Sequence, residues 1–151
     1  MSKSLDEKVT TDLIETLEDG KKGFLAAAEK LVDTTRSDLA PQFREHAEQR
    51  GRFSAELEVL AATYGDDIDE DGSVAAAAHR GWMALKDLLA GSDPDGVLDV
   101  AAKGEEHAVA EYIKALDEDI SPNLRDIVAR QFAEIKTVAA SVQALQAAHG
   151  D

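Results

Sequence analysis

The segment GEEHAVAEYIKAL, residues 104–116, places a glutamate on the side of a helix that should be dry. Helical spacing aligns Glu105 with Ala101, Ala108 and Tyr112, which form an apolar stripe. A carboxylate on a buried helix face can bind a metal ion or pair with a buried base. The chemistry that this sequence offers therefore depends first on Glu105.

One hypothesis is a metal site in which Glu105 is joined by His46 and Glu18 around iron, manganese or zinc. Carboxylate and imidazole groups bind such ions, and di-metal helical bundles place them on facing helices. Those bundles use two Glu-x-x-His pairs together with two further glutamates, whereas this sequence contains no Glu-x-x-His. An arginine on the same inward surface would also repel the ions. Di-iron chemistry is therefore disfavoured, and no cofactor is expected.

The other hypothesis is a structural polar layer at the middle of the helices. Arg50 lies on the inward line of its helix, and one arginine beside one carboxylate satisfies both charges without a cofactor. Gln131 and Tyr112 are expected to complete the hydrogen bonds of this layer, because an unpaired buried charge is costly. The two hypotheses differ in one respect: Arg50 points at Glu105 in the second and away from it in the first.

Three glycines, Gly20, Gly51 and Gly104, fall near the same level of their helices. Each costs about 1 kcal/mol relative to alanine inside a helix. They predict that helices approach closely there, or that they leave room for a bulky group. A third hypothesis, a small apolar ligand held in that room, predicts a closed central cavity.

Apolar residues spaced three, four and seven apart predict four long helices that would position these side chains. The helices are expected over about residues 5–34, 39–64, 94–116 and 122–145. Asp38, Asp93 and Ser121 are the expected N-caps, and a proline follows each of them within three residues. No stretch alternates with period two, so strands are not expected.

Between the second and third long helices, residues 65–93 form a predicted crossover that contains an extra short helix around Trp82. Its first part resembles half of a calcium loop, with Asp67, Asp69 and Asp71 at the first, third and fifth positions. The twelfth position is Ala78 and not the bidentate glutamate, so an acidic turn is favoured over a calcium site.

Two helical hairpins joined by one long crossover predict an all-α, ferritin-like antiparallel four-helix bundle. At 151 residues the chain fits one domain, residues 1–151, with a substantial core. Any oligomer would form by side-by-side packing of bundles.

The formal net charge of −15 disfavours nucleic acids and anionic membrane surfaces as partners. No stretch approaches the roughly 20 apolar residues of a membrane span, and no signal peptide is recognised at the start. A cytoplasmic protein is expected. The absence of cysteine excludes disulfides and thiol nucleophiles.

Five segments carry a family resemblance, in order along the chain: LIETLEDGKKGF (13–24), FREHAEQRGRFSAEL (43–57), HRGWMALK (79–86), GEEHAVAEYIKAL (104–116) and RQFAEIKTVAASVQAL (130–145). The sequence resembles a bacterial family of uncharacterised, ferritin-like four-helix-bundle proteins, sometimes grouped with stress-associated proteins. The resemblance implies the bundle fold and supplies no reaction. We therefore expect a non-enzymatic structural or interaction protein whose partner is a second copy or an unknown protein.

Overall fold

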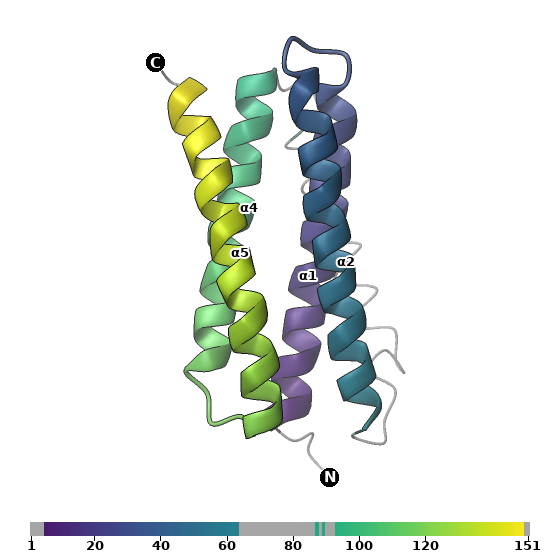
Figure 1. Cartoon of the computed structure of the whole chain (residues 1–151), viewed down its shortest axis with the longest axis vertical. Helices are drawn as coiled ribbons and strands as arrows, with labels where there is room; N and C mark the ends of the chain where they lie inside the picture. The colour runs from purple at the N-terminus through teal and green to yellow at the C-terminus, as the bar shows by residue number, and fades with distance from the viewer. Residues whose placement is uncertain (1–4, 64–86, 88, 90–92, 150–151) are drawn as a thin grey trace.

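The computed structural model describes residues 5–63, 87, 89 and 93–149, which form four long helices (Figure 1). These are α1 (Leu5–Leu31), α2 (Ala40–Ala62), α4 (Pro94–Leu116) and α5 (Pro122–His149), with a short 3-10 helix, η1 (Ser37–Leu39), before α2. The described residues contain no strand, so the prediction of an all-α protein is confirmed. The predicted short helix around Trp82 and the calcium-like loop with Asp67, Asp69 and Asp71 fall on residues outside those that the structure describes.

The long helices run side by side along the long axis of the molecule (Figure 1). The principal packing pairs are α1 with α2, α4 with α5, and α1 with α4. None of the helices in the described ranges is long and apolar enough to cross a membrane.

Two of the three expected N-caps are present. The Asp93 carboxylate accepts a hydrogen bond from the Gly96 amide at 2.9 Å, with Pro94 in the first turn. Ser121 Oγ accepts from the Leu124 amide at 3.4 Å. These short polar side chains satisfy helix amides that have no partner inside the helix.

The start of α2 corrects the third prediction, because Asp38 is not the N-cap. Asp38 lies inside η1, and α2 begins at Ala40 without a side-chain cap. The Asp38 carboxylate instead accepts from Arg36 Nε at 3.3 Å. The first helix also ends earlier than expected, at Leu31, where the Thr34 hydroxyl donates to the Leu31 carbonyl at 2.7 Å. A side chain that supplies the partner for a terminal carbonyl favours ending the helix there.

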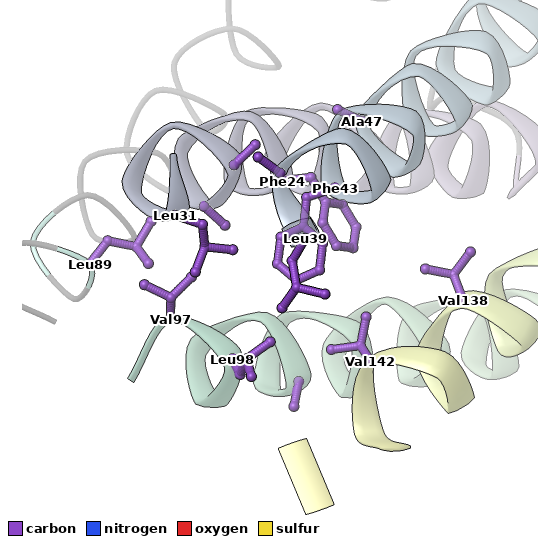
Figure 2. Packing of buried hydrophobic residues seen from close by; sticks show 14 residues of the cluster. Phe24, Leu31, Leu39, Phe43, Ala47, Leu89, Val97, Leu98, Val138 and Val142 are labelled. Carbon is purple, nitrogen blue, oxygen red and sulfur yellow. The ribbon is translucent and has the colours of Figure 1, made fainter. Parts of the chain in front are cut away.

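The core consists of two apolar clusters stacked along the long axis. Figure 2 shows one of them, in which Phe24, Phe43 and Leu39 pack against residues of α4 and α5. On each of α1, α2 and α4, one cluster ends and the other begins at a common level of the bundle. This boundary falls between Leu17 and Phe24, between Ala47 and Phe53, and between Ala102 and Ala108. Arg50 and Glu105 lie at this level, so a buried charge pair interrupts the apolar core.

Candidate functional site

Arg50 of α2 and Glu105 of α4 face each other between the two clusters and form a bidentate pair. Arg50 Nη1 donates to Glu105 Oε1 at 3.0 Å, and Nη2 donates to Oε2 at 2.6 Å. Arg50 is 1% exposed and Glu105 is 2% exposed. Two parallel charge-assisted hydrogen bonds between these buried groups hold both side chains in one geometry.

The remaining surface of the guanidinium is also covered. Arg50 Nε donates to Gln49 Oε1 at 3.3 Å, and the guanidinium carbon lies 5.3 Å from the centroid of the Phe24 ring. Arginine can stack on an aromatic ring while its edge donates hydrogen bonds. Arg50 is thus fixed by contacts to α1, α2 and α4.

Burial raises the pKa of the Glu105 carboxyl, and the charge and hydrogen bonds of Arg50 oppose that rise. The cost of taking the carboxylate out of water is therefore offset only because Arg50 is beside it.

Two of the three glycines contact long basic side chains of the opposite helix. A Cβ at Gly20 would lie 3.5 Å from Arg50 Nη1 and 3.6 Å from its Cγ, whereas a Cβ at Gly51 would lie 3.6 Å from Lys21 Cδ. The contacts are reciprocal. Gly20 of α1 lies opposite Arg50 of α2, and Gly51 of α2 lies opposite Lys21 of α1. Both distances are ordinary van der Waals contacts, so an alanine would fit at Gly20 and at Gly51, whereas a longer side chain would meet the basic residue of the opposite helix. A Cβ at Gly104 meets nothing within 4 Å.

Gly104→Ala should raise the free energy of unfolding by about 1 kcal/mol, because alanine favours a helix and the added methyl group meets no neighbour. Gly20→Leu should lower it, since the longer side chain would displace the Arg50 guanidinium from Glu105. Urea denaturation measures both changes. A loss of stability in Gly104→Ala would show that the space beside residue 104 is not free.

A second polar group involves Tyr112 of α4 and Gln131 of α5. The Tyr112 hydroxyl donates to Gln131 Oε1 at 2.7 Å, and Gln131 Nε2 donates to Glu56 Oε1 at 2.8 Å and to the Phe53 carbonyl at 3.3 Å. Gln131 therefore links its own helix, α5, to α4 and to α2. Burial raises the pKa of Tyr112, so its hydroxyl stays protonated as a donor.

The expected layer of four side chains is thus divided into two pairs. Arg50 bonds Glu105, and Tyr112 bonds Gln131, but the hydrogen bonds of Gln131 go to Tyr112, Phe53 and Glu56 and do not complete the shell of Arg50. Tyr112 follows Glu105 by seven residues on α4, which is two helical turns, or roughly 10 Å along the axis. This separation explains why a single layer does not form.

The three proposed metal ligands are placed in different surroundings. Glu18 Oε1 accepts from the Ser54 hydroxyl at 2.8 Å, and Glu105 is bonded to Arg50. The His46 ring packs against the Phe24 and Phe43 rings, which also contact each other, with centroid distances from His46 of 5.1 and 6.0 Å. Among the described residues, no group of three or more His, Asp or Glu side chains is arranged to hold a metal ion.

His46 Nε2 is buried without a hydrogen-bond partner. Burial lowers the pKa of the His46 imidazole, and the nearby Arg50 charge lowers it further. A neutral imidazole packed against two phenyl rings behaves as an apolar group, so we interpret half-buried His46 as covering the edge of the core at Phe24 and Phe43.

Sequence reasoning missed two polar residues of this region, Ser54 and Glu56. Ser54 follows Arg50 by four residues and is 1% exposed, so its inward position could have been read from helical spacing. Glu56 reaches inward from the edge of α2 and also pairs with Arg130. No spacing rule marks it, because its position depends on how closely α5 approaches.

Comparison with protein families matches residues 7–118 to a family described as Domain of unknown function (DUF2383). Comparisons with curated proteins and with solved structures give no match.

Proposed function

The chain belongs to the family described as Domain of unknown function (DUF2383), and we propose that it is a non-enzymatic structural or interaction protein. The observation that supports this proposal is the Arg50–Glu105 pair. Both carboxylate oxygens of Glu105, which is 2% exposed, accept hydrogen bonds from the Arg50 side chain. Glu105 then has a structural role, because its pair with Arg50 holds α4 against α2.

The proposed architecture is a single-domain, ferritin-like antiparallel bundle in which a crossover joins two hairpins. The pairing of α1 with α2 and of α4 with α5 supports it. We place the protein in the bacterial cytoplasm and associate it with stress, as the family resemblance implies.

The proposed partner is a second copy of the chain or another protein that packs side by side with this bundle. Large apolar side chains are exposed on three helices: Val59 on α2 is 74% exposed, Ile113 on α4 is 53% exposed and Leu25 on α1 is 45% exposed. Nucleic acids and membrane surfaces are not proposed as partners, because the net charge of −15 repels phosphate groups.

The metal content of untagged protein, purified without chelator, tests this proposal against the alternative of a carboxylate and histidine metal site. We expect no stoichiometric iron, manganese or zinc by inductively coupled plasma mass spectrometry, in the parent protein or in Glu105→Gln. Glu106→Gln is the matched control, because Glu106 is the exposed neighbour of Glu105. Stoichiometric metal that disappears in Glu105→Gln and persists in Glu106→Gln would overturn the structural role and make Glu105 a ligand.

A further inference from the structure

A pocket of about 130 Å³ lies between α1 and α4 beside the Arg50–Glu105 pair. Its walls are mostly apolar or lack side chains, including Phe24, Ala27, Ala101, Ala108, Gly20 and Gly104. Leu89, which is 5% exposed, also lines it. Gly104, where an added Cβ would meet nothing within 4 Å, is one of the lining residues.

Asp19 is an acidic residue of the pocket lining that has a hydrogen-bond acceptor without a donor. Its Oδ1 atom is buried and has no hydrogen-bond partner. Asp19 as a whole is half-buried, and the other acid in the lining, buried Glu105, is already paired with Arg50. The pocket therefore combines an apolar interior with one carboxylate oxygen free to accept a hydrogen bond.

The groups around Asp19 are few. Burial raises its pKa, Lys22 and exposed His107 act in the opposite direction, and neighbouring Glu18 adds to the rise. A carboxylate oxygen that is buried without a donor is stabilised by a cation that reaches it. The net charge of −15 further favours cations over anions as ligands.

We propose that the pocket between α1 and α4 binds a small organic cation, a primary ammonium on an apolar body the size of one ring, with Asp19 as its counterion. Size supports this class, because an apolar cavity of about 150 Å³ admits benzene. The ammonium would donate to Asp19, and the ring would lie against Phe24 and the small side chains of α4. This binding role goes beyond the proposed structural function and does not depend on it.

Titration of the ¹⁵N-labelled full chain with benzylammonium tests the proposal, using benzyl alcohol and benzoate as neutral and anionic probes of similar shape. We expect saturable amide shifts confined to residues 16–27 and 100–108, with benzylammonium binding more tightly than either other probe. Asp19→Asn should weaken benzylammonium binding by roughly tenfold or more, because the charge-assisted hydrogen bond is lost. Gly104→Leu should abolish it by filling the pocket.

Asp12→Asn is the matched control, because Asp12 is also a half-buried acid of α1 but lines a different groove beside Lys8 and Lys114. It should leave the affinity unchanged. The proposal is overturned if benzylammonium gives no saturable shifts, if all three probes bind equally, or if Asp19→Asn and Asp12→Asn behave alike. Circular dichroism shows whether each variant is folded. Metal content does not bear on any of these outcomes, so this proposal and the structural one fail separately.

Discussion

Glu105→Leu should lower the free energy of unfolding by about 3–5 kcal/mol, the largest effect that we expect from a single substitution. The change leaves the Arg50 guanidinium, which is 1% exposed, without its counterion. Arginine cannot lose its proton inside a protein, so the buried charge remains and must be hydrated by opening the structure. The loss measures the cost of an unpaired charge and not the net value of the pair.

Urea denaturation at neutral pH measures this loss, with Glu106→Leu as the control on the exposed face of the same helix. The control should change stability by no more than about 0.5 kcal/mol, as expected for a surface position. Equal effects of the two substitutions would show that Arg50 does not depend on Glu105.

Arg50→Met should also destabilise the protein strongly, but by an amount that depends on pH. Burial already raises the pKa of Glu105, and removing Arg50 removes the two effects that oppose this rise. Unlike arginine, the carboxyl can take up a proton and become neutral. The variant should therefore lose least stability in acid, where Glu105 is protonated, and most at neutral pH.

The direction of this pH dependence follows from the numbers of protons that the folded and unfolded states of the variant bind. The folded variant keeps a proton on Glu105 at pH values where the unfolded chain, with an ordinary pKa of 4.5, has lost it. Because the folded state binds more protons, its stability falls as pH rises from 4.5 through the raised pKa of Glu105.

Denaturation midpoints of the parent, Arg50→Met and Glu105→Leu, measured from acid to neutral pH, test this asymmetry. The stability of Arg50→Met relative to the parent should decline with rising pH. The stability of Glu105→Leu relative to the parent should not decline, because this variant lacks the carboxyl whose raised pKa makes the parent lose stability over the same pH range, and its guanidinium does not titrate there. Parallel profiles for the two variants would contradict the expected proton uptake by Glu105.

Much of the fold could be predicted from the sequence because the signals are local. Helical spacing of apolar residues locates α2, α4 and α5, and Asp93 caps its helix as expected. The end of α1 and the start of α2 could not be predicted as well. They depend on which side chain finds a partner in the turn, and there Arg36 binds the Asp38 carboxylate that was expected to cap α2.

Residues of the site could be predicted from the sequence if they lie on the buried face of their own helix. Spacing alone places Glu105 and Arg50 inside, and charge then favours their pairing. The seven residues between Glu105 and Tyr112 already separate these two side chains by two turns of α4. Spacing does not give the level at which α5 meets α4 and α2, so the partners of Gln131 could not be foreseen. The unpaired oxygen of Asp19 depends on the packing of α1 against α4, which no single helix specifies.

The structural role of the Arg50–Glu105 pair is tested most directly by the stability of the double variant Arg50→Met/Glu105→Leu, compared with that of both single variants. Two apolar side chains of similar volume leave no buried charge, so the double variant should lie far closer to the parent than either single variant and should match or exceed its stability. Losses that simply add would contradict the account, because they would show that Arg50 and Glu105 contribute independently and do not form one structural unit.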